Sequence, residues 1–88
     1  MPEIQFPAIL ECAPDGFGVF FPDLPGCVSH GRTAEEAATN GEEALALHLA
    51  GMVEDGEAIP EPTPIESLER DSEVEEAARI MVRVEAPA

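Results

Sequence analysis

The chain has 88 residues, a net charge of −15 and a hydrophobic fraction of 44 %. This length allows one domain with one modest core, and the apolar content excludes wholesale disorder. The charge arises from 19 Asp and Glu residues against four Lys and Arg. It disfavours binding to nucleic-acid phosphates and favours a basic partner, although solubility alone is an equally good explanation.

Targeting and redox signals point to a cytoplasmic protein. The opening "MPEIQF" lacks the basic start and apolar run of a secretory signal. No apolar stretch approaches the roughly 18 residues of a membrane span, so no membrane partner is expected. We therefore expect Cys12 and Cys27 to be reduced and to pack as small hydrophobic side chains in the core.

Three short strands are predicted before residue 33. Residues 4–12 alternate, and Pro7 favours an edge position or a strand that begins after it. The predicted core face of this strand carries Phe6, Ala8, Leu10 and Cys12. "APDG" at 13–16 has the chemistry of a type I turn and predicts a hairpin to a second strand at 17–21. A third strand is predicted at 27–32, ending at Gly31.

The segment "PDLPG" between the second and third strands is predicted to be a rigid loop. Pro22 and Pro25 withdraw two backbone donors, and Gly26 permits a left-handed conformation. Proline rigidity lowers the ordering cost of binding, so we expect Leu24, held out beside Asp23, to serve as a docking point.

A helix is predicted from Thr33 to about Glu54. Thr33 and Glu36 match a capping box, in which the hydroxyl accepts from the N3 amide and the carboxylate from the cap amide. Small residues in its first half allow close approach to a sheet. The buried stripe is predicted to contain Ala34, Ala37, Ala38, Gly41, Ala44, Leu45, His48, Leu49 and Met52, and the opposite side Glu36, Asn40, Glu43, Leu47 and Glu54.

The second half of the chain is predicted to be a connector and a last strand. Residues 55–78 are rich in proline and acids and cannot continue the helix. Residues 79–85 alternate, with Ile80, Val82 and Val84 on one face. The fold class is therefore α+β with the order β-β-β-α-β, in which one long helix covers a small antiparallel sheet.

The residues do not indicate catalysis. His30 and His48 are the only histidines, and neither has a Cys or Asp at ligand spacing, so no metal or other cofactor is expected. The carboxylates are dispersed along the chain, and we expect no catalytic residue and no enzyme activity. A metal-dependent nuclease, which would require Glu11 or Asp23, stays as an alternative.

Association with another protein is the activity that the residues favour. Leu47 is an apolar side chain among acids on the polar side of the helix. The residues predicted to bind a partner are Asp23, Leu24, Glu36, Glu43 and Leu47.

The run "ECAPDGFGVFFPDLPGCVSHGRTAEEAATNGEEALALHL", followed by "GEAIPEPTP", resembles the HicB family of antitoxins. The resemblance implies a partial RNase H-like fold and a single domain over residues 1–88. It also implies binding to a HicA-type toxin, a small basic protein that cleaves mRNA. Many family members continue into a DNA-binding segment, which is not expected within these residues.

Two alternatives to the antitoxin function are an RNase H-like nuclease and an orphan oligomeric domain without a toxin. Under all three, a homo-oligomer is expected, with a dimer through a sheet edge or the last strand favoured.

Overall fold

The computed structural model describes residues 2–87 and confirms the predicted α+β order. Within that range, no helix is both long and apolar enough to cross a membrane. The elements are β1 (Glu3–Ala13), β2 (Gly16–Phe20), β3 (Val28–Gly31), α1 (Ala34–Glu54), the 3-10 turn η1 (Ile65–Ser67) and β4 (Glu76–Glu85).

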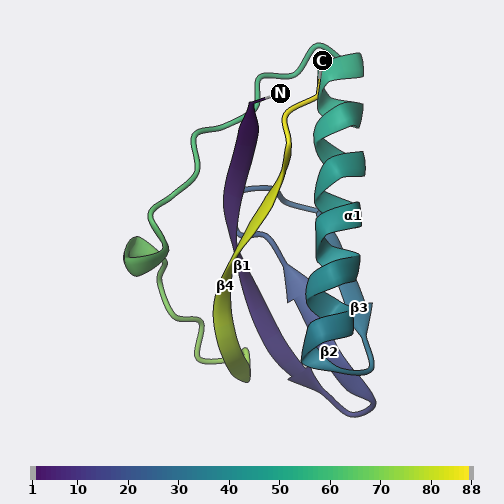
Figure 1. The fold of residues 1–88 in the computed structure, drawn as a ribbon. Coiled ribbons are helices and arrows are strands. Elements are labelled where there is room, and N and C mark those ends of the chain that lie inside the picture. The colour runs from purple at the N-terminus through teal and green to yellow at the C-terminus, as the bar shows by residue number, and fades with distance from the viewer. Residues whose placement is uncertain (1, 88) are drawn as a thin grey trace.

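The strands form one antiparallel sheet in the order β3-β2-β1-β4, and α1 lies along one face of it (Figure 1). The predicted hairpin is present, with Ala13 opposite Gly16. Pro7 lies in the half of β1 that is flanked by β4 alone, because pairing with β2 begins at Ile9. The strand thus tolerates a residue without a backbone donor.

β4 begins at Glu76, before the predicted start at Arg79. Its first residues continue the ladder with β1, where Ala78 is opposite Leu10 and Glu76 is opposite Glu11 across a bulge. The proline and acid content of the preceding residues gave no signal of this extension.

The core lies between the sheet and α1, and it contains most of the predicted apolar positions. Phe6, Ala8 and Leu10 are buried, as is Val82 on β4. The helix buries Ala37, Gly41, Leu45 and Leu49 against them. Each large apolar side chain removed from water in this way contributes about 1.5–3 kcal/mol of transfer free energy.

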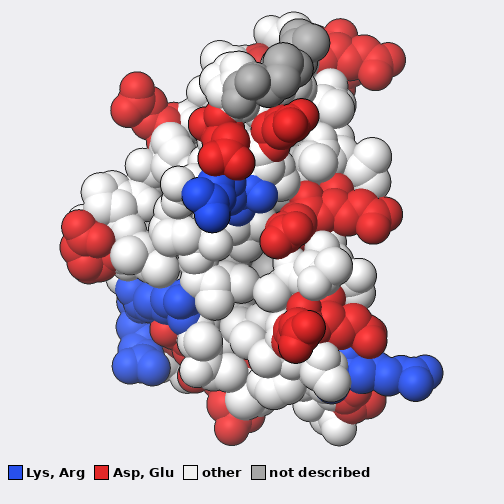
Figure 2. All heavy atoms as spheres, viewed as in Figure 1, with Lys and Arg blue, Asp and Glu red and all other residues white. Residues whose placement is uncertain are grey.

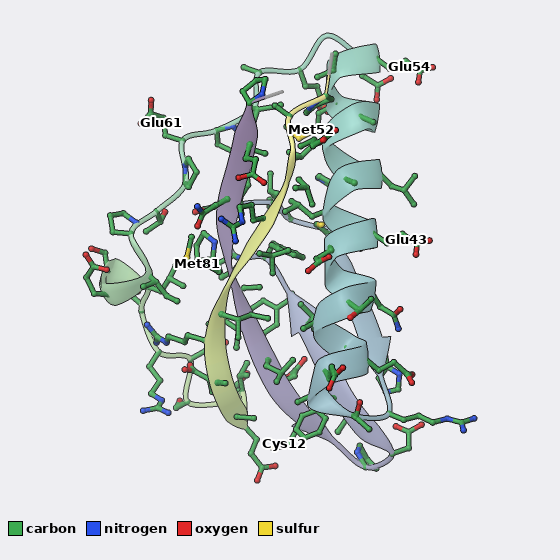
Figure 3. All side chains as sticks on the ribbon, in the orientation of Figure 1. Cys12, Glu43, Met52, Glu54, Glu61 and Met81 are labelled. Atoms are coloured by element: carbon green, nitrogen blue, oxygen red, sulfur yellow. The ribbon has the colours of Figure 1, made fainter. Side chains whose placement is uncertain are left out.

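The two cysteines differ. Cys27 is buried in the core, and desolvation raises the pKa of its thiol. The prediction that Cys12 also packs inside is wrong, because Cys12 is exposed near the hairpin end of β1, where that strand has passed the buried centre of the sheet (Figure 3).

Thr33 is the N-cap of α1, as predicted, and its hydroxyl accepts a hydrogen bond from the Glu36 amide at 3.0 Å. The second half of the capping box differs from the prediction. With the Thr33 backbone extended, the Glu36 carboxylate accepts from the Arg32 amide at 3.1 Å instead of from Thr33 itself. The helix start is still closed by two reciprocal bonds between the helix and the residues that enter it.

Gly31 sets the distance between the start of α1 and the sheet. A Cβ at Gly31 would collide with the backbone of Ala37 in the first turn of α1. Further along, a Cβ at Gly41 would lie 3.3 Å from the Val19 side chain. The close approach predicted from small helix residues is thus present at Gly41, and Gly31, which was predicted only to end the strand, contributes to it as well.

The face of the sheet opposite α1 is covered by the connector, which runs along that side in Figure 1. Pro7 and Ile9, predicted to face away from the core, are buried there. Arg79, opposite Ile9 on β4, donates through Nη1 to the carbonyl oxygens of Ile65 and Leu68 at 3.2 and 2.8 Å. These bonds hold the connector to the sheet.

A second anchor joins the connector to the loop between β2 and β3. Both carboxylate oxygens of Asp23 accept from Thr63, one from its amide at 2.8 Å and one from its hydroxyl at 2.6 Å. Asp23 is therefore a structural residue of this loop.

The prediction that Leu24 is held outward is wrong. The Leu24 amide donates to Phe21 O and its carbonyl accepts from Cys27 N, so the loop folds into consecutive turns. These turns direct the Leu24 side chain into the core, where it is 1 % exposed. The loop is rigid, as predicted, but its apolar residue is an internal anchor.

Gly31→Ala should destabilise the fold by about 1–3 kcal/mol, because the added methyl group meets helix backbone that cannot rotate away. Gly51→Ala is the matched control, since a Cβ at this helical position meets nothing within 4 Å and alanine should stabilise by roughly 0.5–1 kcal/mol. Urea unfolding measures both changes. Equal effects of the two substitutions would contradict the close approach of α1 to β3.

Leu24→Ala should lower the free energy of unfolding by about 2–5 kcal/mol, because it leaves a cavity in the core. Leu47→Ala removes the same atoms from an exposed helix position and should change it by less than about 0.5 kcal/mol. Thermal or urea unfolding compares the two variants, and a neutral Leu24→Ala would show that the loop does not fold inward.

Candidate protein-binding surface

A shallow groove of about 240 Å³ lies between α1 and the outer strand β3. Positions 40, 43, 44 and 47 recur at helical spacing, so they share one side of α1. Ser29 closes the groove from β3 and faces the helix, as Gly31 does two residues later. The groove is lined by Ser29, Asn40, Glu43, Ala44 and Leu47.

Exposed apolar side chains flank this groove. Leu47 is 68 % exposed, and Val28 at the start of β3 is 62 % exposed. Val28 precedes Ser29 and therefore points to the opposite face of the sheet. Single exposed apolar residues are common, but here two of them border one edge of the sheet.

Two of the predicted partner-binding residues, Glu43 and Leu47, line the groove together. Figure 3 shows Glu43 projecting from α1 on the side away from β4. The other three lie elsewhere: Asp23 binds the connector, Leu24 is in the core and Glu36 caps the helix. Glu43 and Leu47 are therefore the two members of the predicted set that line the groove.

Asn40 is a groove residue that the sequence did not single out as functional. Its side-chain Nδ2 donates to the His30 carbonyl oxygen at 2.8 Å and so ties the helix to β3. The available signal was its position on the predicted outer side of the helix, one turn before Glu43. Propensity patterns alone could not show that this side overlies a strand edge.

The side of the molecule that carries α1 is predominantly negative, and Glu43 is the carboxylate that lines the groove. Figure 2 shows carboxylates at several heights along the side of the molecule that carries α1, with few basic side chains between them. Two of the four arginines have carboxylate partners, Arg79 with Glu76 at 2.8 Å and Arg83 with Glu3 at 3.8 Å. A basic surface would therefore be attracted to this side of the protein.

The same region offers few groups for chemistry. Among residues 2–87, no set of three or more His, Cys, Asp or Glu side chains converges as a metal site would require. His30 lies 3.4 Å from Asp15, and both are exposed. The burial that raises the pKa of Cys27 keeps its sulfur as a thiol at neutral pH, which is the less nucleophilic form.

Glu76 has the one carboxyl group with a shifted pKa in the described part of the chain. Its hydrogen bond from Arg79 lowers the pKa below the ordinary value of 4.5, partial burial opposes this, and the charges of Arg79 and Arg70 add to it. The pair lies beside the connector and has a structural function, since the same guanidinium also binds the carbonyls of Ile65 and Leu68.

The difference in stability between wild type and Glu76→Gln should depend on pH because of the pairing with Arg79. A carboxyl group with a depressed folded pKa stabilises the protein above its ordinary pKa and loses that contribution as the pH falls through the folded value. The difference in unfolding free energy between wild type and Glu76→Gln should hold from neutral pH to near 4.5 and shrink below it. In an Arg79→Met background the pH dependence of this difference should shrink, because the hydrogen bond that lowers the pKa most is lost and only the charge of Arg70 still lowers it. A difference that grows on acidification would contradict the pairing.

Comparison with known proteins gives matches over nearly the whole chain. Residues 6–88 match the family model described as "HicB_like antitoxin of bacterial toxin-antitoxin system". An uncharacterised 14.9 kDa protein of Haemophilus phage HP1 is 46 % identical over 61 residues, which cover 69 % of this chain and 46 % of that protein. Antitoxin HicB of Escherichia coli K12 is 35 % identical over 72 residues, covering 81 % and 52 %.

Solved structures agree with the fold. The N-terminal domain of Burkholderia pseudomallei antitoxin HicB superposes with a TM-score of 0.71 at 28 % identity, covering 97 % of this chain and 100 % of that one. A chain of a toxin-antitoxin complex from Streptococcus pneumoniae gives a TM-score of 0.82 at 22 % identity, covering 96 % and 70 %.

The residues matched by the family model, 6–88, include α1, β2, β3, β4 and most of β1. The chain spans about half the length of these relatives, 46 % of the phage protein and 52 % of the Escherichia coli antitoxin. The chain belongs to the HicB-like antitoxin family.

Proposed function

We propose that this chain acts as an antitoxin that binds and neutralises a small basic toxin of the HicA type, without catalysing a reaction. The observation that carries the proposal is the groove between α1 and β3, which is lined by the Glu43 carboxylate and the exposed Leu47. Family membership supports it, as does the similarity, with a TM-score of 0.71, to a chain of the complex named "HicA3 and HicB3 toxin-antitoxin complex".

Electrostatics supports a basic partner. A net charge of −15 accelerates the encounter with a cationic protein and repels acidic competitors. Exposed charges are screened over about 8 Å at physiological ionic strength, so this contribution should fall with added salt. The apolar contact at Leu47 would then supply a part of the affinity that salt does not weaken.

Within this proposal, residues 1–88 form one toxin-binding unit in the cytoplasm, and DNA is not a ligand of these residues. The predicted dimer would use β4, the outer strand on the far side of the sheet from the groove. The nuclease alternative draws no support from the described carboxylates, because they do not gather into a metal-binding set.

Co-expression with a small basic protein of the HicA type tests the proposal. The pair should restore growth of cells that the basic protein alone inhibits, and the two proteins should elute together from a sizing column. Growth inhibition that persists in the presence of soluble antitoxin, with separate elution of the two proteins, would contradict the function.

Charge reversal at the groove should weaken the complex. Glu43→Lys should raise the dissociation constant about tenfold, since it places a cation where a basic surface docks. Glu61→Lys makes the same change in net charge on the exposed connector, away from α1 (Figure 3), and is the matched control. Equal weakening by both would show that net charge, and not this groove, governs binding.

A further inference from the structure

The backbone N–H and C=O groups of successive β3 residues point alternately toward β2 and toward the outer edge of the sheet. Phe21 N donates to Cys27 O at 3.2 Å, so the backbone of Cys27 faces β2. Successive residues of a strand turn their amides and carbonyls to opposite sides. Ser29 therefore also faces β2, while Val28 and His30 face the outer edge.

The hydrogen bond of Asn40 agrees with this assignment. It reaches the His30 carbonyl oxygen at 2.8 Å from α1, outside the ladder between β2 and β3. The outer edge of β3 therefore presents the N–H and C=O of Val28 and the N–H of His30. Such a row of backbone groups is a template for another strand.

The groove continues from this open edge along α1. The helical stripe from Asn40 to Leu47 is about 10 Å long at about 1.5 Å per residue. Side chains on one face of an extended strand are about 6.7 Å apart. The stripe is therefore long enough to contact two side chains on one face of a strand added beside β3. Glu43 would lie between these two side chains and Leu47 at one end.

We propose that the partner adds an extended segment to the outer edge of β3, and that this segment alternates basic and apolar residues. Its backbone pairs with Val28 and His30. On the helix side Lys or Arg side chains meet Glu43 and lay their aliphatic stems against Leu47, while apolar side chains on the opposite face cover Val28. The inference rests on the proposed function, for which it supplies the contact surface and the binding mode.

The occupant is a basic segment of another protein and not a second copy of this chain. A second copy would bring an equal charge of −15 to the acidic side of α1. A cationic strand gains from the same field.

Two substitutions at one position separate strand addition from side-chain contact. Val28→Pro removes the outward N–H, and an outer strand can accommodate proline there, whereas Val28→Ala keeps the N–H and removes only the side chain. For the complex with the co-expressed basic protein, Val28→Pro should raise the dissociation constant about tenfold more than Val28→Ala. Unfolding by urea checks that both variants remain folded. Met81→Ala on β4 is a control for the loss of an exposed apolar side chain away from β3.

Equal effects of the two Val28 variants on the dissociation constant would overturn the proposal.

A synthetic peptide tests the surface without any toxin. A ten-residue peptide of alternating valine and arginine, added to ¹⁵N-labelled protein, should shift the Val28 and His30 amide resonances and slow their hydrogen exchange. A peptide of alternating valine and glutamate should do neither. Shifts on the β4 edge or at scattered carboxylates, without protection of Val28 and His30, would overturn strand addition, as would the absence of any change.

The two experiments distinguish the two proposals. If the peptide protects the β3 amides but no toxin binds the protein, the proposed function is refuted and the proposed β3 surface is retained. If Val28→Pro does not change the dissociation constant of the toxin complex, the proposed β3 surface is refuted and the proposed function is retained. Concentration-dependent self-association that protects the same two amides would show that a second copy, and not a basic segment, occupies the edge.

Discussion

The contact between Gly31 and the first turn of α1 fixes the rest of the structure. Because no Cβ intervenes, the backbone of β3 and the backbone around Ala37 can touch. This contact places the helix axis over the outer strand and leaves its neighbouring face to Asn40, Glu43 and Leu47. A wider separation would remove the hydrogen bond from Asn40 to His30 and open the groove into a flat surface. The groove is thus a consequence of this close approach of helix and strand backbone.

Both faces of the sheet are covered at least in part. One face receives the apolar side of α1, including Leu45 and Leu49. The other receives the connector, fixed at Asp23 and Arg79 by hydrogen bonds to its backbone and to Thr63. An extended, proline-rich segment carries few internal hydrogen bonds, so bonds to its amides and carbonyls from charged side chains are an effective means of fixing it.

The elements that could be predicted from the sequence are those with local signals. The hairpin at 13–16, the cap at Thr33 and the alternation of β4 each depend on residues close in sequence, and the structure confirms them. Leu24 and Cys12 were misplaced because burial depends on what lies opposite in space. The same limit applied to the groove. The sequence placed Glu43 and Leu47 on one side of the helix. It could not predict that the edge of β3 lies beside them, or that Asn40 joins helix and strand, because both depend on the topology of the sheet.

The two ends of the described chain lie together, since the Ala86 amide donates to the Pro2 carbonyl at 2.9 Å. Figure 1 places both ends near the Glu54 end of α1, while Figure 3 shows Glu43 about midway along the helix. A purification tag, a fluorophore or a tethered second protein could therefore be joined at either terminus and would leave from the same corner of the molecule. Immobilisation through that corner would orient every molecule with its β3 edge turned toward the solution.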